Sequence, residues 1–345
     1  MRLLYCAAAL VAAAPFAHTF AHAQSVTAGQ AATQIMPATS PTYTQLDSVN
    51  VEGAQPGPGL WQVSKGGHTV WILGTVSPLP SGMQWQSATV KEVIAQSQEI
   101  IYPPSIDINA NIGFFKGLFL YNSLRKMDRN PDGKQLKDVL SAPAYARWQK
   151  LKARYMPNDK DVDKKRPMFA GGELLRAAYA KSGLSEKSLI WPPIRDAAKA
   201  AKLKVTSTSI KLTIDDPSKA LKEFKDESMN DESCLSSSMA LLENNIPAVK
   251  ARANAWARGD VARIRQLPIS DLGSNCVQAL MEAKVAAKRG LHDAPSKMKA
   301  NWLSAVDKAL VNNERSFAVL SVDMLLGRDG YLAALRSKGY EIVEP

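Results

Sequence analysis

The sequence predicts a mixed α/β fold with a central mixed β-sheet built from segments near both ends of the chain. Short apolar runs typical of strands occur near each end, and a large middle region has the apolar spacing of amphipathic helices. Strands that are far apart in the chain, with helices between them, favour one sheet closed by both termini. The 345 residues are 46% hydrophobic and 22% charged, which excludes a collagen-like or wholly disordered chain.

The first 24 residues have the pattern of a secretory signal peptide. Met1-Arg2 is a short basic start, residues 3–17 are apolar, and Ala21-His22-Ala23 is typical of a cleavage site. The apolar stretch is shorter than the ~20 residues that cross a bilayer. We therefore expect cleavage near Ala23 and a mature protein that spans no membrane and is periplasmic or secreted.

Residues 25–57 are predicted to be a disordered, low-complexity linker. Residues 25–46 carry no charge and are rich in Ala, Thr, Ser, Gln and Pro. The alternating segment Asp47–Gly53 resembles the TonB-box segments of outer-membrane receptors, which add a strand to a partner. The resemblance is one short run, and a plain spacer is the favoured interpretation. The folded domain is expected over residues 58–345.

Two adjacent strands open this domain, and the other elements follow in order. The runs 60–64 and 69–76 are joined by Lys65–His68, and its glycine pair is typical of a hairpin turn. Further strands are expected at 99–102, 203–207, 316–322 and 340–343. Helices are expected at 87–95, 112–127, 141–156, 168–182, 194–202, 216–228, 231–244, 247–258, 276–289, 297–311 and 329–339.

The cysteines and the charge indicate where the protein works. Cys6 leaves with the signal peptide, so Cys234 and Cys276 are expected to pair as a disulfide in an oxidising compartment. A redox or metal pair is the alternative, but it lacks CxxC spacing and a nearby histidine. The net charge of +11 suits an envelope polysaccharide or a periplasmic protein as partner, or only solvated helix faces. Nucleic acid is excluded by export and by basic runs without interleaved aromatic residues.

The common catalytic motifs are absent. The chain has no GxSxG, HExxH, P-loop or GxGxxG sequence. His68 is expected on the surface at the hairpin turn, and His292 in a polar stretch after a helix. The acidic residues form no cluster with metal-ligand spacing, so we expect no metal site and no cofactor.

Both ends of the domain resemble the TraB/GumN family. The resemblance covers residues 59–345 and rests on Leu60–Gly66, Val70–Val76, Ala251–Asp260, Phe317–Leu320, Leu326–Leu332 and Leu335–Val343. It implies a mixed α/β fold shared with Tiki-type metalloproteases and erythromycin esterase-like proteins. It also implies an active site with a histidine in a first Gly-x-x-His motif, glutamates after later strands, and a histidine in a second such motif.

This chain departs from the family pattern at each of those places. Ser77 follows Gly74-Thr75-Val76 in place of the first histidine, and Pro103 and Ser209 stand near the expected glutamates. Met324 stands where the second histidine is expected. Imidazole and carboxylate bind divalent metals well, whereas a protonated hydroxyl binds weakly and proline offers no side-chain donor. The substitutions predict that the family's metal chemistry is lost.

A candidate pocket remains at Gly74, Thr75, Ser77 and Asp323, which lie near one another if their strands are neighbours. Ser77 as a nucleophile would need a base within hydrogen-bond reach, and none is obviously placed. The favoured function is therefore a non-catalytic binding or scaffold protein of the cell envelope. One alternative is a metal-dependent peptidase or esterase with relocated ligands (Asp107, Glu173, Asp323 and Asp329). Another is an envelope interaction protein that uses its basic surface and residues 25–57.

Overall fold

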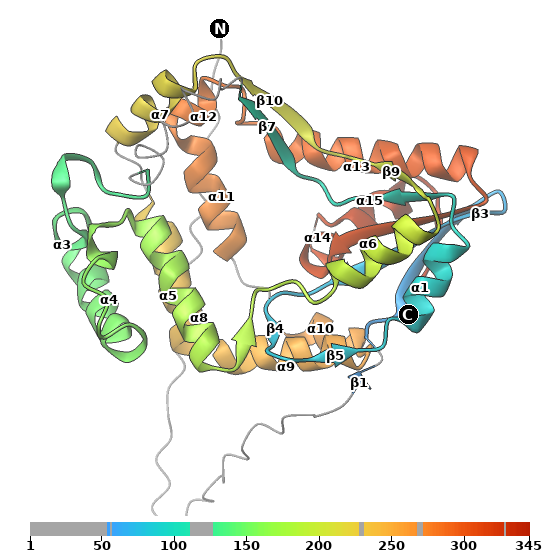
Figure 1. The fold of residues 1–345 in the computed structure, drawn as a ribbon, viewed down its shortest axis with the longest axis horizontal. Coiled ribbons are helices and arrows are strands. Elements are labelled where there is room, and N and C mark those ends of the chain that lie inside the picture. Colours follow the sequence, from blue (N-terminus) through green and yellow to red (C-terminus); the bar gives the residue numbers. More distant parts are fainter. Residues whose placement is uncertain (1–53, 56, 111–126, 228–230, 268–271, 328) are drawn as a thin grey trace, which may run out of the picture. The chain divides into compact units, whose positions relative to one another are not determined.

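The computed structural model contains a six-stranded mixed sheet (Figure 1). It describes residues 54–55, 57–110, 127–227, 231–267, 272–327 and 329–345. The strand order is β12-β2-β3-β11-β6-β9. β3 pairs antiparallel with β2 and parallel with β11, so strands from the two ends of the chain lie side by side. The predicted mixed α/β fold is confirmed. None of the described helices is long and apolar enough to cross a membrane.

The elements have the following bounds. The strands are β1 (Ala54–Gln55), β2 (Leu60–Lys65), β3 (His68–Thr75), β4 (Leu79–Pro80), β5 (Gln84–Trp85), β6 (Glu99–Ile101), β7 (Ile106–Ala110), β8 (Leu184–Ser185), β9 (Lys204–Thr206), β10 (Ile210–Ile214), β11 (Arg315–Ser321) and β12 (Glu341–Val343). The helices are α1 (Ala88–Ala95), α3 (Leu136–Val139), α4 (Ala142–Tyr155), α5 (Pro167–Lys181), α6 (Trp191–Ala200), α7 (Pro217–Asp226), α8 (Glu232–Asn244), α9 (Ile246–Ala257), α10 (Val261–Gln266), α11 (Leu272–Glu282), α12 (Lys284–Ala287), α13 (Ala294–Asn312), α14 (Val322–Leu326) and α15 (Tyr331–Ser337).

The predicted hairpin of β2 and β3 is confirmed. Lys65 pairs with His68, and the two residues between them are Gly66 and Gly67, with φ of 58° and 86°. Side chains rarely tolerate a positive φ, so the glycine pair explains why the chain reverses here. β1 lies within the range 25–57 that the sequence assigns to a linker, and it pairs with β5.

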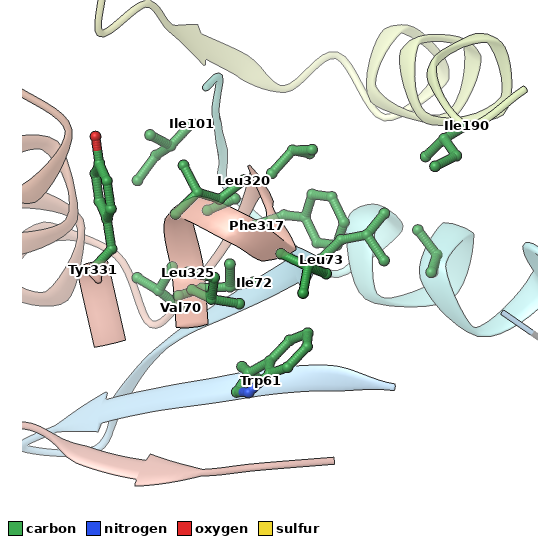
Figure 2. Close-up of a cluster of buried hydrophobic side chains, with 14 of the residues drawn as sticks. Trp61, Val70, Ile72, Leu73, Ile101, Ile190, Phe317, Leu320, Leu325 and Tyr331 are labelled. Atoms are coloured by element: carbon green, nitrogen blue, oxygen red, sulfur yellow. The ribbon is translucent and has the colours of Figure 1, made fainter. Parts of the chain in front are cut away.

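Apolar side chains cover both faces of the sheet. Figure 2 shows Val70 and Leu325 on the side of Tyr331, whereas Phe317 and Leu73 lie toward Ile190. Alternation along a strand sends successive side chains to opposite faces, so a strand buried on both faces is a nearly continuous apolar run. The runs in β3 and β11 have this character.

A second hydrophobic core lies among the helices of the middle region. α4, α5 and α8 bury apolar side chains against one another, including Trp148, Leu174 and Leu235. The guanidinium of buried Arg166, at the start of α5, donates hydrogen bonds to the carbonyl oxygens of Phe224 (2.6 Å) and Lys225 (2.9 Å). These bonds satisfy carbonyls at the end of α7 that have no partner within the helix.

Prolines move several helix starts upstream of their predicted positions. α6 begins at Trp191 rather than at 194, and α13 begins at Ala294 rather than at 297. Proline lies in the first turn of both helices, where its missing N–H would have had no intrahelical partner. Such a proline therefore starts a helix instead of preventing one.

Other differences have local causes. The predicted helix 276–289 is divided at Ala283, which has an extended backbone, and the next N–H, that of Lys284, donates to the Glu227 carboxylate. β7 and β10 were not predicted, and they form a separate parallel ribbon. The predicted helix 112–127 lies outside the described residues except at its last position.

Cys234 in α8 and Cys276 in α11 form the predicted disulfide, with a Cα–Cα distance of 4.6 Å. The two cysteines are 42 positions apart, so the bond closes a long loop in the unfolded chain. By the chain-entropy relation, this closure stabilises the native state by about 4 kcal/mol.

We expect reduction to lower the free energy of unfolding of the mature protein by about 4 kcal/mol, measured by urea denaturation with and without reductant. The double variant Cys234→Ala/Cys276→Ala serves as the control, because reductant should not change its midpoint. An unchanged midpoint for the wild-type protein in reductant would contradict the prediction.

Buried Glu99, at the start of β6, makes stability depend on pH. Burial alone would raise the pKa of this carboxyl, but hydrogen bonds from Thr206, Lys204 and Asn313 outweigh burial and hold the pKa below its usual 4.5. A lowered folded-state pKa means that the ionised form stabilises the fold. This contribution is complete above the unfolded-state pKa and is lost as pH falls through the folded-state value.

Glu99→Gln should therefore be less stable than the wild-type protein at pH 7, and the difference should shrink as the pH falls below about 4.5. Urea unfolding at a series of pH values measures this. Exposed Glu92 on α1 provides a matched control, since Glu92→Gln should change stability little throughout. A difference for Glu99→Gln that stays constant from pH 7 to pH 3 would refute the assignment.

Candidate functional site

The carboxyl ends of four parallel strands meet at one edge of the sheet. Ser321 of β11 pairs with Thr75 of β3, and Ile101 of β6 pairs with Thr206 of β9. β11 and β6 are parallel neighbours, so all four strands end on the same side. In open sheets of parallel strands, ligands bind outside these carboxyl ends.

The four positions singled out by the sequence follow these four strand ends. Ser77 comes two residues after β3, Pro103 two after β6, Ser209 three after β9, and Met324 lies in α14 directly after β11. The structure therefore places all four positions at the same edge. None of their side chains is an imidazole or a carboxylate.

Ser77 and Thr75 line a small cavity at this edge. The cavity has a volume of about 220 Å³, and its far wall is the segment from Ser185 to Trp191. The short strands β4 and β8 pair antiparallel and hold that segment beside the end of β3. Ser77 is exposed, and the Thr75 hydroxyl donates to the carbonyl of Leu320 (3.4 Å). The cavity thus offers hydroxyl groups near the family's first histidine position.

Gly74 supports the edge but does not line the cavity. Its carbonyl oxygen accepts a hydrogen bond from the indole Nε1 of buried Trp256 in α9 (2.8 Å). A Cβ atom at this position would lie 2.6 Å from Trp61 and 2.9 Å from Val322. Glycine is required here because the indole of Trp61 and the side chain of Val322 leave no room for a Cβ atom.

Asp323 pairs with an arginine rather than with Ser77. Its carboxylate accepts a hydrogen bond from Nη2 of Arg252 in α9, and no hydrogen bond joins Asp323 to Ser77 among the described residues. The Arg252 side chain is 12% exposed, and its buried Nη1 has no acceptor in the described part of the chain. Arg252 and Trp256 are four residues apart and lie on one face of α9. The sequence predicted this helix but not these two contacts.

Pro103 and Ser209 lie on two segments that run together beyond the sheet. The Thr208 hydroxyl donates to the carbonyl of Tyr102 (3.0 Å), and the Ile210 N–H donates to the carbonyl of Ser105 (2.9 Å). The hydroxyls of Ser209 and Ser207 are 2.9 Å apart. Each segment continues into the β7–β10 ribbon. At this part of the edge the Thr208 hydroxyl is bonded to the backbone, and the hydroxyls of Ser207 and Ser209 bond to each other.

The described residues contain no group of three or more His, Cys, Asp or Glu side chains that could hold a metal ion. Among the candidate relocated ligands, Glu173 pairs with Lys165 and Arg176, and Asp323 pairs with Arg252. Burial would raise the pKa of Glu173, but its two cationic partners lower it. Asp107 and Asp329 lie in β7 and after α14.

The fold and this edge define an α/β protein whose candidate site follows four parallel strands. The chain belongs to the TraB/PrgY/gumN family, whose model matches residues 59–344 and so nearly all of the predicted domain. No curated protein and no solved structure matches the chain significantly.

We expect Gly74→Ala to destabilise the protein by about 1–3 kcal/mol, because the added methyl group must displace Trp61 or Val322 from a packed core. Thermal or urea unfolding measures the change. Gly172→Ala in α5 is the control: its Cβ meets nothing within 4 Å, and alanine favours a helix by up to about 1 kcal/mol. Equal effects of the two substitutions would show that the edge is not tightly packed around Gly74.

Proposed function

We propose that this protein is an exported, periplasmic, non-catalytic binding or scaffold protein of the cell envelope. One observation carries the proposal: the residues after the carboxyl ends of the four parallel strands include Ser77, Pro103, Ser209 and Met324. These positions correspond to the histidines and glutamates that the family resemblance implies.

The chemistry of these side chains supports the loss of metal-dependent catalysis. A hard or borderline divalent cation is held by imidazole and carboxylate groups, whereas methionine suits soft metals and proline has no donor. Replacement of one ligand leaves the other ligands to hold an ion. Replacement of all four leaves no donor set of the family type at this edge.

Hydrolysis by Ser77 without a metal also lacks support. A serine nucleophile needs a general base within hydrogen-bond reach. His68 begins β3, and the seven residue steps from it to Thr75 span about 23 Å at ~3.3 Å per residue. Two carboxylates belong to this edge: Asp323 is held by Arg252, and Glu186 lines the cavity opposite Ser77. A serine paired with a carboxylate alone, without a histidine, is a poor catalytic couple. The serine is therefore better suited to binding than to attack.

The cavity is smaller than a typical substrate-binding site. Its volume of about 220 Å³ is below the ~300–1,000 Å³ of typical small-molecule sites. Ser185, Glu186, Lys187 and Ser188 add polar groups of both charges to the wall opposite Ser77. A cavity of this size accommodates a single polar group of a partner. Such a contact is consistent with a scaffold role.

Export is supported by two independent features. The first 24 residues have the composition of a signal peptide, and the pairing of Cys234 with Cys276 suits an oxidising compartment.

The test is thermal unfolding of the chelator-stripped mature protein with and without Mn²⁺, Zn²⁺ and Co²⁺. We expect no shift with any of the three metals. A metal that binds only the native state would add ~2.7 kcal/mol of stability at a hundred times its dissociation constant, which is a shift of several degrees. A saturable shift would favour the metal-dependent hydrolase with relocated ligands and would overturn this proposal.

A reconstruction of the family side chains supplies the positive control. The variant Ser77→His/Pro103→Glu/Ser209→Glu/Met324→His restores the implied donor types at the four positions. It should gain a metal-dependent shift that the wild-type protein lacks. A shift in the wild-type protein of equal size would mean that the four positions do not decide metal binding.

A further inference from the structure

A second hollow lies at the opposite edge of the sheet, where β3 and β11 begin and α1 ends. It has a volume of about 690 Å³, within the ~300–1,000 Å³ of small-molecule sites. Its lining comes from β2, β3, the segment after α1 and the start of β11. We call it the hairpin groove. It shares no residue with the small cavity at Ser77.

Strand pairing presents an aromatic ring beside an amide in this groove. Trp71 of β3 pairs directly with Gln62 of β2, so the two side chains stand next to each other on one face of the sheet. Both side chains are half-buried and line the groove. A half-buried indole in a groove offers a flat apolar surface to a ligand while its other side packs on the core.

Uncharged amides supply the hydrogen-bonding groups on the other wall. Gln96 and Gln98 follow α1 and line the groove together with Gln62. The Gln98 side-chain oxygen accepts the N–H of Arg315 (3.2 Å), which fixes the amide and directs its NH₂ group away from that bond. His68 contributes a buried ring nitrogen, Nδ1, that has no partner among the described residues. These groups both donate and accept hydrogen bonds.

The charges of the groove cancel, although the whole chain carries a net charge of +11. Glu314 and Arg315 are the acidic and basic residues of the lining, one of each. The Arg315 guanidinium donates to the Gln96 side-chain oxygen, so it is engaged by a neutral partner. An anionic ligand would find no excess of cations here, and an apolar ligand would leave the amides without hydrogen-bond partners.

We propose that the hairpin groove binds a neutral oligosaccharide. Sugar hydroxyls donate and accept hydrogen bonds as amides do, and the apolar face of a pyranose ring fits against the open side of a half-buried indole. Trp71 would stack on one ring, while the amides of Gln62 and Gln98 would bind hydroxyl groups. This inference does not rest on the proposed loss of catalysis, because the groove lies at the other edge of the sheet.

Isothermal titration calorimetry of the mature full chain with cellotetraose, maltotetraose and tetra-N-acetylchitotetraose tests the proposal. We expect at least one of these neutral sugars to bind with a dissociation constant below 1 mM, on the order of the weakest specific ligands. Trp71→Leu keeps apolar volume but removes the flat ring, and it should weaken binding at least tenfold. Gln62→Ala should do the same without touching the core.

The control is Gln84→Ala, which removes an exposed glutamine on β5, outside the groove, and should leave the affinity unchanged. Absence of heat with all three sugars at millimolar concentration would overturn the proposal. Binding that is unaffected by both groove variants would place the sugar elsewhere and would also overturn it. If the groove variants instead change the sedimentation of the protein without sugar, the groove is an interface between two copies.

Discussion

Seven residue pairs join β3 to β11, from Thr69 opposite Arg315 to Thr75 opposite Ser321. This parallel pairing fixes both edges of the sheet at once. Its carboxyl end brings Ser77 and α14 to the same edge, and its amino end brings the β2–β3 hairpin to Arg315 and the segment after α1. The small cavity and the hairpin groove therefore depend on the same register, and a shift by one residue would turn every side chain of the pair to the opposite face.

The apolar runs of β3 and β11 made the core of the fold predictable from the sequence. Both strands are buried on two faces, so each is a continuous apolar run bounded by polar residues. β7 and β10 were missed although Ile210–Ile214 alternates between half-buried and exposed residues, because five residues beside prolines and serines are a weak signal. The division of the helix at Ala283 was not predictable, since it depends on the distant carboxylate of Glu227.

The candidate site was predictable in its positions but not in its contacts. The resemblance to a known family identified Ser77, Pro103, Ser209 and Met324, and the fold puts the segments that carry them at one edge. The sequence also suggested that Asp323 approaches Ser77, whereas the structure pairs Asp323 with Arg252. That contact comes from α9, whose placement over Gly74 is decided by tertiary packing of Trp256, which no local pattern reveals.

The long separation between β3 and β11 also sets the order in which the protein can fold. The Thr75 hydroxyl and the Leu320 carbonyl that it contacts are 245 positions apart, so the central pairing needs almost the whole domain to be present. Contacts of such high sequence separation form slowly, because loop-closure entropy is lost before they stabilise the chain. α4, α5 and α8 have a hydrophobic core of their own, within a much shorter stretch. The helical middle can gain structure first, and the sheet then closes around its last long strand.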